Sequence, residues 1–369
     1  MINLAFFLPD LGGGGAEKVI TNLMRYINEN DKKINIILFV NKISGPNIKK
    51  IPNEIKLIEL SSYNIIFSFI KLSSYIKNLN IHYLISTVRG ANIAAALSTF
   101  IYKKHIWILR EANTFTNPNH KKNFKEKIIN FFCYITYNRA DYIIANSPDT
   151  KNDLIRNCFN LKKIDIKVLP NPVMLLSQYR KKVCLKKTSK KLIAVGRLVP
   201  QKNFHQLIMA ISNLINKGES ISLDIYGEGY LNSELKKLIA KLKCQNSIKI
   251  LPYNENIIEC YPEYDLFVSN SKWEGFGNVL VEAMGAGLPV ISTNCPGGPQ
   301  YIFPDDSKMI SLVPLDCSID ELSLAIQHAL LNRSNYTEND IYNLIQHAKK
   351  FSVEVICQQY LDYILNLNK

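Results

Sequence analysis

MINLAFFLPDLGGGGAEKVITNLMRYIN, residues 1–28, is the stretch that decides the fold. Residues 2–8 are a strand-like run, apolar except for Asn3, with the length of a buried strand. Gly12–Gly15 separate this run from a segment, Ala16 to about Asn28, whose apolar residues recur at helical spacing. A strand, a glycine turn and a helix in this order predict the start of a parallel α/β sheet with both faces covered.

The same alternation continues along the chain in two series. Pro170-Asn171-Pro172 ends the first series, and residues 180–191, with seven basic residues and no acid, precede the second. We therefore predict an α/β protein with two doubly wound, Rossmann-like domains. The predicted strands are 2–8, 34–40, 55–60, 83–86, 106–110, 142–145 and 166–169 in the first series, and 192–195, 222–226, 247–251, 265–269, 289–292 and 309–313 in the second. Predicted helices of the second series and the chain's end span about 203–217, 231–243, 277–286, 319–332, 337–349 and 352–367.

The predicted domain boundaries follow from this pattern. Residues 1–170 form an N-terminal domain, 171–191 a basic linker, 192–350 a C-terminal domain and 351–369 a final helix. Ligands of open α/β sheets bind beyond the carboxyl ends of the strands, so residues that directly follow strands are the first candidates for a site.

Composition excludes several classes of protein. Hydrophobic residues make up 47% and charged residues 21%, as in a globular chain rather than a disordered one. No apolar run reaches the roughly 18 residues of a membrane span, and the N-terminus lacks the basic start of a signal peptide. Eight cysteines lie 16 or more residues apart without CxxC pairs, which predicts reduced thiols in the cytosol rather than disulfides or a zinc site. No Asp-x-Asp occurs, which argues against a divalent metal that holds a nucleotide. We expect no metal requirement and no cofactor.

Charge is distributed unevenly between the two halves. Residues 1–191 carry 31 basic and 12 acidic side chains, a balance of +19, whereas residues 192–369 carry 14 and 19, a balance of −5. The excess in the first half favours an anionic partner: nucleic acid, anionic lipid or a phosphorylated substrate. The same excess is equally consistent with a role in solubility alone.

The most specific segment is SKWEGFGNVLVEAMGAGLPV, residues 271–290. Glu274 opens the loop after a predicted strand, and Gly275–Asn278 offer unobstructed amides at the start of the next helix. Glu282 is expected to face outward from that helix. Two carboxylates on either side of such amides can bind the hydroxyls of a sugar and a ribose around a phosphate.

Other loops at strand ends give weaker signals. Gly12–Gly15 can hold an anion at a helix N-terminus or can be only a flexible turn, and their spacing fits neither a dinucleotide fingerprint nor a Walker loop. Gly196-Arg197 with Lys202 suits a diphosphate, although such cation pairs are common at strand ends. Gly227–Gly229 and Tyr253 could present backbone groups and a flat surface to a base.

Residues 121–139 form an amphipathic helical pattern with an apolar stripe and a basic start. The stripe could lie on an anionic bilayer, where each basic residue near the surface contributes about 1 kcal/mol. More often such a stripe packs into a protein core. The stripe consists of Phe124, Ile128, Phe131, Phe132 and Ile135, and the basic residues are Lys121, Lys122, Lys125 and Lys127.

Together these features resemble the retaining GT-B glycosyltransferases of family 4, over most of the chain. The resemblance rests on the Gly-Gly-Ala-Glu turn at 14–17, on Gly196-Arg197 with Lys202, on Gly227–Gly229, on the Glu-x7-Glu element Glu274/Glu282 and on the Pro-Gly-Gly-Pro at 296–299. It implies two Rossmann-like domains that face each other across a cleft, with the last helix crossing back to the first domain.

The resemblance also implies roles for individual residues. Arg197 and Lys202 would bind the donor diphosphate, Glu282 the ribose, and Glu274 the transferred sugar. The remaining donor-binding positions would be Gly13, Gly14, Gly15, Gly196, Gly227, Tyr253, Gly275, Phe276, Gly277, Asn278 and Val279. Many relatives have a histidine after the fourth or fifth strand of the first domain, where this chain has Arg110-Glu111-Ala112-Asn113. Glu111, as a catalytic residue, and Asn113, on the acceptor and sugar side, are the expected substitutes.

The function that these expectations describe is hexosyl transfer. The donor would be a UDP-linked hexose or N-acetylhexosamine, and the acceptor a lipid-linked glycan of bacterial lipopolysaccharide, capsule or other glycan biosynthesis. The enzyme would lie in the cytoplasm, peripherally on the inner face of the membrane, and would bind no nucleic acid. Two alternatives remain: a nucleotide-sugar epimerase of the GT-B type, and a non-catalytic protein that binds nucleic acid or another anion.

Overall fold

The computed structural model describes residues 1–116, 124–179 and 190–367. The chain divides into two compact units. Unit 1 comprises residues 1–172 together with 353–369, and unit 2 comprises residues 173–352. Most of the basic stretch predicted as a linker, residues 180–189, lies outside the described residues.

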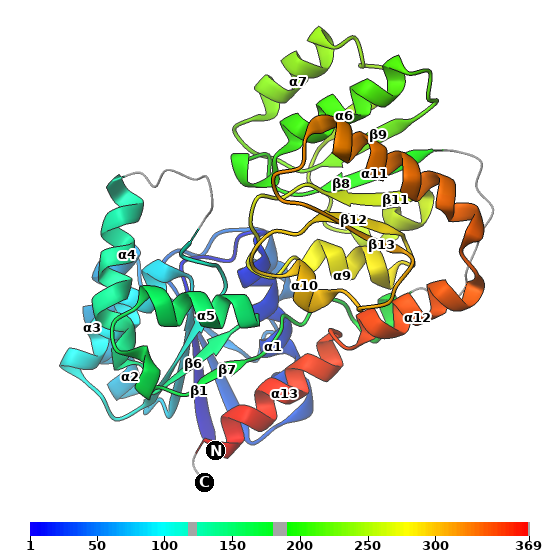
Figure 1. Cartoon of the computed structure of the whole chain (residues 1–369). Helices are drawn as coiled ribbons and strands as arrows, with labels where there is room; N and C mark the ends of the chain where they lie inside the picture. Colours follow the sequence, from blue (N-terminus) through cyan, green and yellow to red (C-terminus); the bar gives the residue numbers. More distant parts are fainter. Residues whose placement is uncertain (117–123, 180–189, 368–369) are drawn as a thin grey trace. The chain divides into compact units, whose positions relative to one another are not determined.

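Unit 1 is built on a parallel sheet that has seven strands among the described residues, in the order β3-β2-β1-β4-β5-β6-β7 (Figure 1). Side chains of the central strand alternate between two cores, because successive residues of a strand point to opposite faces. Ala5 and Phe7 pack with α2, α3 and α4, whereas Leu4, Phe6 and Leu8 pack with α1 and α13. The strands are β1 (Ile2–Leu8), β2 (Ile34–Val40), β3 (Lys56–Glu59), β4 (Tyr83–Thr87), β5 (Ile106–Glu111), β6 (Tyr142–Ala145) and β7 (Ile166–Val168). The helices are α1 (Gly15–Asn30), α2 (Phe69–Asn78), α3 (Arg89–Ile101), α4 (Phe124–Thr136), α5 (Pro148–Asn157) and α13 (Val353–Asn366).

The last helix, α13, completes unit 1 although it follows all of unit 2 in the sequence. Its buried face joins the core formed by α1 and the sheet. The hydroxyl of Tyr360 on α13 accepts a hydrogen bond from Arg110 Nε at 3.1 Å and donates one to the Leu169 carbonyl at 3.2 Å. Arg110 is fully buried and also donates to Thr87 and Asn171, so these three partners of its guanidinium are neutral groups.

Unit 2 has a parallel sheet of six strands within the described residues, in the order β10-β9-β8-β11-β12-β13. One face packs on α6, α7 and α11, and the other on α8, α9, α10 and α12. The strands are β8 (Lys191–Val195), β9 (Ser222–Tyr226), β10 (Ile248–Leu251), β11 (Leu266–Ser269), β12 (Val290–Thr293) and β13 (Ile310–Val313). The helices are α6 (Phe204–Asn216), α7 (Asn232–Lys241), α8 (Ile257–Cys260), α9 (Asn278–Gly285), α10 (Pro299–Ile302), α11 (Ile319–Asn332) and α12 (Glu338–Lys349).

The predicted fold class is confirmed, since both units are parallel sheets with helices on both faces. Every predicted strand is present within two residues at each end, and the long helices agree equally well. The one-turn helices α8 and α10 were not predicted, because four residues are too few to show a helical period. Within the described residues, no helix has the length and apolar character needed to cross a bilayer.

The amphipathic helix is present as α4, but its apolar stripe is not part of the core. Phe124 is 81% exposed and Phe131 60%, and Ile128, Phe132 and Ile135 are also exposed. The inner face of α4 buries Cys133 and Thr136 instead. The sequence left open whether this stripe contacts a bilayer or packs into the protein core. The structure excludes its burial in the core of unit 1.

Candidate active site

In unit 2 the candidate residues follow the carboxyl ends of β8, β9, β10 and β11. The loops after β8 and β9 interlock through their backbones: Gly196 N donates to the Tyr226 carbonyl and Leu198 N to the Glu228 carbonyl. A Cβ atom at Gly227 would lie 1.9 Å from the Gly196 carbonyl oxygen, so only glycine permits this approach. The two loops are thereby held as one rigid edge that carries Arg197 and Lys202.

Lys202 and Glu274 are brought together at this edge from positions 72 residues apart. Lys202 Nζ lies 2.5 Å from Glu274 Oε1, and the Ser271 hydroxyl donates to the same oxygen at 2.6 Å. Both charged side chains are largely buried, which strengthens their attraction relative to a surface pair. Arg197, by contrast, is exposed.

Gln201 is a residue of this edge that the sequence analysis missed. Its side chain donates to the Trp273 carbonyl at 2.8 Å, and its own carbonyl accepts from Lys272 N at 2.8 Å. These bonds tie the loop after β8 to the loop after β11. No motif signals such a role, because a glutamine in a loop is usually only solvated.

The loop from Glu274 to Gly277 is braced from behind by the loop at residues 295–298. Glu274 N donates to the Pro296 carbonyl at 3.0 Å. Gly298 lies so close that a Cβ atom there would be 1.6 Å from the Phe276 carbonyl oxygen. The brace fixes where the amides at the start of α9 point.

One prediction about this segment needs correction. Glu282 does not face outward: it is 4% exposed, and the buried Tyr261 hydroxyl donates to its Oε2 at 3.2 Å. Burial, with the nearby Glu282 carboxylate, raises the pKa of Tyr261 well above its ordinary value, so the phenol stays a donor. Phe276 is also buried, with its ring against Tyr301 and Phe351, so it can offer a ligand only its backbone. α9 is apolar on nearly every side, which hides its orientation in the sequence.

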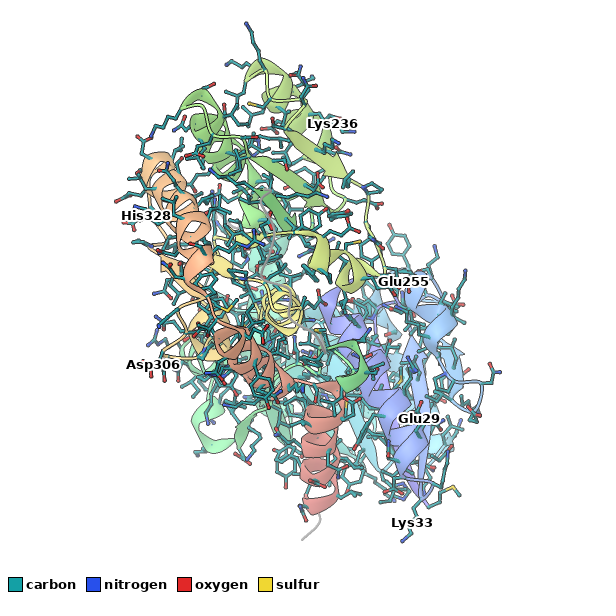
Figure 2. All side chains as sticks on the ribbon, turned by 90° about the vertical axis from the view of Figure 1, so that its right-hand side faces the viewer. Glu29, Lys33, Lys236, Glu255, Asp306 and His328 are labelled. Carbon is teal, nitrogen blue, oxygen red and sulfur yellow. The ribbon has the colours of Figure 1, made fainter. Side chains whose placement is uncertain are left out.

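In unit 1 the glycine turn follows β1 and leads into α1, whose N-cap is Gly14. The turn is held by side chains around it: Asp10 Oδ1 accepts from Gly12 N at 2.8 Å, and Asn47 Nδ2 donates to the Gly12 carbonyl at 2.5 Å. Glu29, labelled in Figure 2, marks the other end of α1. Asn47 is a further residue that the sequence did not single out.

Glu111 is placed in the interior of unit 1, not at its surface. Its Oε2 accepts from the Tyr137 hydroxyl at 2.9 Å and lies 3.8 Å from Arg89 Nε, and its Oε1 accepts from the amides of Ala112 and Asn113 at 3.1 Å. In this arrangement Glu111 holds the loop that follows β5, and its contact with a sugar stays a prediction. The Asn113 side chain on that loop is exposed.

The family described as Glycosyltransferase Family 4 matches residues 13–175, and the family described as Glycosyl transferases group 1 matches residues 177–350. A Campylobacter jejuni protein is 30% identical over 319 residues, covering 83% of this chain and 84% of its own length. The chain is a family 4 glycosyltransferase. The Campylobacter relative is named N-acetylgalactosamine-N,N'-diacetylbacillosaminyl-diphospho-undecaprenol 4-alpha-N-acetylgalactosaminyltransferase.

Solved structures agree on the fold. HepE of Anabaena, in complex with UDP and glucose, has a TM-score of 0.80 at 18% identity over the whole of both chains. The lipopolysaccharide outer core galactosyltransferase WaaB has a TM-score of 0.73 at 19% identity over 99% of both. The resemblance read from the sequence, the GT-B fold and the classification as a glycosyltransferase are confirmed.

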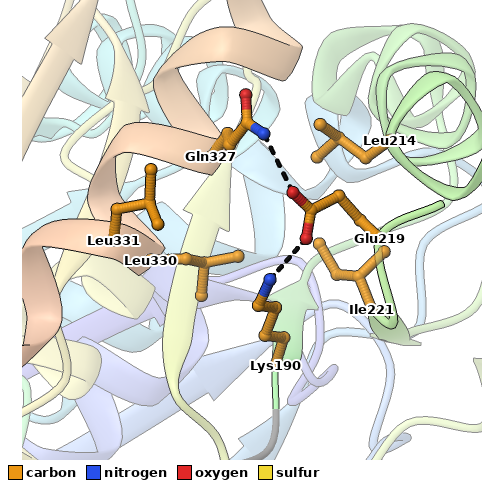
Figure 3. A pocket seen from close by; sticks show the side chains of 7 residues that line it. All are labelled: Lys190, Leu214, Glu219, Ile221, Gln327, Leu330 and Leu331. Atoms are coloured by element: carbon orange, nitrogen blue, oxygen red, sulfur yellow. Dashed lines mark hydrogen bonds and ion pairs between the residues drawn. The ribbon is translucent and has the colours of Figure 1, made fainter. Parts of the chain in front are cut away.

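Other predicted residues of this glycosyltransferase lie at separate places. Tyr253 is half exposed on the loop after β10. Lys125 and Lys127 are exposed on α4, whereas Lys121 and Lys122 lie outside the described residues. A small pocket of unit 2 contains none of the predicted residues; there Lys190 and Gln327 both donate to Glu219, the latter at 2.9 Å (Figure 3).

Proposed function

We propose that this glycosyltransferase moves a hexose or N-acetylhexosamine from a UDP-sugar to a lipid-linked glycan, with retention of the anomeric configuration, in bacterial glycan biosynthesis. The name of the Campylobacter relative, which describes transfer to a diphospho-undecaprenol-linked sugar, supports the acceptor class. The UDP and glucose bound to HepE support the donor class. The observation that carries the proposal is the arrangement of Lys202, Glu274 and Ser271 beside the start of α9.

The chemistry required is stabilisation of a leaving diphosphate. Lys202 has three N–H donors, and Glu274 Oε1 takes one, so the ammonium can also bind a phosphoryl oxygen. The exposed Arg197 guanidinium offers a second, bidentate contact. Fixed cations and helix-end amides aimed at developing negative charge lower the barrier, and the loss of one such donor typically costs about 10²–10³-fold in rate.

The two carboxylates would orient the donor. We assign Glu274 Oε2 to a hydroxyl of the transferred sugar, because Lys202 and Ser271 hold the other oxygen. We assign Glu282 to the ribose, with Tyr261 fixing the carboxylate. In a retaining reaction on one face, the leaving phosphate takes the proton of the acceptor hydroxyl, so no separate general base is needed.

For unit 1 we propose donor-binding amides at Gly13–Gly15 and an acceptor- and sugar-side contact at the exposed Asn113. Both follow strands of its sheet, and Glu111 holds the backbone amide of Asn113. We also propose that α4 rests on the anionic inner face of the cytoplasmic membrane. Its exposed stripe suits the lipid boundary, and Lys125 and Lys127 suit anionic headgroups.

Donor chemistry is tested with the purified protein and a panel of nucleotide sugars. A bound UDP-sugar should raise the unfolding temperature by mass action, and glycosylated lipid product should appear only when acceptor is added. Arg197→Ala/Lys202→Ala should lower kcat/KM by about 10²–10³-fold or more. Lys190→Ala, which removes a lysine from another Lys–Glu pair of unit 2, is the matched control. Unchanged turnover in the double variant would refute the assigned roles, and an altered sugar nucleotide without acceptor would indicate an epimerase instead.

Membrane attachment is tested separately by flotation with vesicles that contain phosphatidylglycerol. Substitution of Lys121, Lys122, Lys125 and Lys127 by Gln should weaken binding and reduce its dependence on salt. Protein that never floats would count against attachment, whatever its activity on a soluble acceptor.

A further inference from the structure

Unit 1 exposes a second group of large apolar side chains, away from α4 in the sequence. Tyr63 is fully exposed, Phe67 is 65% exposed and Ile70 61%. They lie on the segment that leads through a short 3-10 helix (Ile65–Ser68) into α2. We call these three residues the aromatic corner. Large apolar patches on a protein surface mark contacts with a partner or a membrane.

The 3-10 helix Ile65–Ser68, which carries Phe67 of the aromatic corner, and α4 both contact the first turn of α3. On one side, a Cβ at Gly90 would lie 2.7 Å from the Ile65 side chain. On the other side, Arg89 donates to Asn130 of α4 at 2.9 Å. α2, α3 and α4 form the same layer on one face of the sheet (Figure 1). The two exposed apolar groups therefore flank the helix that follows the carboxyl end of β4.

The charge of this region complements an anionic surface. Residues 60–110, which include the aromatic corner, α2 and α3, contain no Asp or Glu. The same stretch contains six Lys and Arg residues: Lys71, Lys77, Arg89, Lys103, Lys104 and Arg110. Arg110 is buried, Arg89 lies 3.8 Å from Glu111, and Lys103 lies 3.0 Å from Asp141. Lys71, Lys77 and Lys104 are exposed. A basic surface with protruding aromatic and aliphatic side chains matches the headgroup region of a bilayer, where the rings meet the acyl boundary and the cations meet phosphates.

We propose that the aromatic corner is a second membrane contact, which inserts into an anionic bilayer together with the stripe of α4. This inference rests on the membrane attachment proposed above. Contact through α4 alone would leave unit 1 able to roll about that helix, whereas two contacts on either side of α3 fix the roll. The fixed orientation turns the carboxyl edge of β4 and β5, with the Asn113 loop, toward the headgroups, where the diphosphate of a lipid-linked acceptor lies.

The test uses full-length protein and vesicles of phosphatidylcholine with phosphatidylglycerol. Phe67→Glu/Ile70→Glu should weaken vesicle binding by at least about tenfold, since two apolar side chains leave the lipid and two anions approach its charge. Tyr342→Glu, at an exposed tyrosine on α12 of unit 2, is the control and should bind as the wild type does. In a Tyr63→Trp variant, lipids brominated on the acyl chains should quench the added fluorescence.

The outcomes separate this inference from the proposed reaction. Wild-type vesicle binding by Phe67→Glu/Ile70→Glu, or a Trp at position 63 that brominated lipid leaves unquenched, would overturn the second contact even if the α4 variants lose binding. Dimers in solution that the same double substitution dissociates would also overturn it, because the surface would then be a protein interface. If the inference holds, the double variant keeps wild-type kcat/KM on a short-chain soluble acceptor and loses rate only on acceptor in vesicles.

Discussion

Gly298→Ala should damage the candidate active site, although Gly298 itself is assigned to no contact with substrate. The added Cβ would lie 1.6 Å from the Phe276 carbonyl oxygen, and such contacts are not found below 3.0 Å, so the carbonyl must retreat by at least 3.0 − 1.6 = 1.4 Å. Because the Phe276 ring is buried against Tyr301 and Phe351, the loop cannot shift without repacking. A misplacement of 1 Å can cost on the order of 10²-fold in rate, so we expect kcat/KM to fall about 100-fold.

The assay is steady-state transfer from the best donor, with chemical unfolding measured in parallel. Overpacking should cost about 1–3 kcal/mol of stability, and activity is compared where the variant is folded. Gly218→Ala is the control: its φ of +86° strains an alanine, but no atom lies within 4 Å of the added Cβ. It should lose stability and keep kcat/KM. A folded Gly298→Ala enzyme with wild-type kcat/KM and nucleotide affinity would refute the idea that residues 295–298 position the amides of α9.

Three further predictions concern stability and the carboxylate at the site. His105 is buried without a hydrogen-bond partner among the described residues, and burial lowers its pKa to about 4. Because the unfolded chain then binds a proton more readily than the folded one, the free energy of unfolding should be highest above pH 6.5. It should fall by on the order of 3 kcal/mol as the pH drops to 4. The free energy of unfolding of His105→Leu, measured over the same pH range, should not show this decrease. The same pH dependence in the variant and the wild type would contradict the prediction. Tyr360→Phe should lower the free energy of unfolding by about 1–3 kcal/mol, because it removes a partner of the buried Arg110, and an unchanged denaturation midpoint would contradict that reasoning. Ser271→Ala should lower kcat several-fold and leave the fold intact, because Glu274 loses one of the two bonds that orient it; an unchanged kcat would show that Lys202 alone suffices.

The fold could be predicted from the sequence because its strands are buried on both faces. Runs such as residues 2–8 and 34–40 are apolar except for Asn3 and Asn35, and near-continuous apolar runs of this length are typical of strands in a parallel sheet. The glycines that end the strands could be recognised for the same reason, since they stand where the periodicity changes. Local sequence patterns were therefore sufficient to predict most of the strands and turns.

The site could be predicted only in part, because side-chain direction depends on contacts between distant segments. Glu111 is turned inward by Arg89 and Tyr137, and Glu282 by Tyr261. The stripe of α4 has the same spacing whether it meets a core or solvent, so periodicity alone could not decide its exposure. Gly298 is needed because it packs against the Phe276 carbonyl, 22 residues earlier in the chain, and no local sequence motif indicates this contact.

The placement of α13 has a consequence for synthesis. A ribosome completes residues 173–352, all of unit 2, before it adds the helix that closes the core of unit 1. Until then the apolar face awaiting Ile356 and Ile364 is uncovered, and Arg110 lacks the phenol of Tyr360. The segment made first is thus the last to be able to finish folding, and a nascent chain stalled before residue 353 should expose a hydrophobic surface for chaperones to bind.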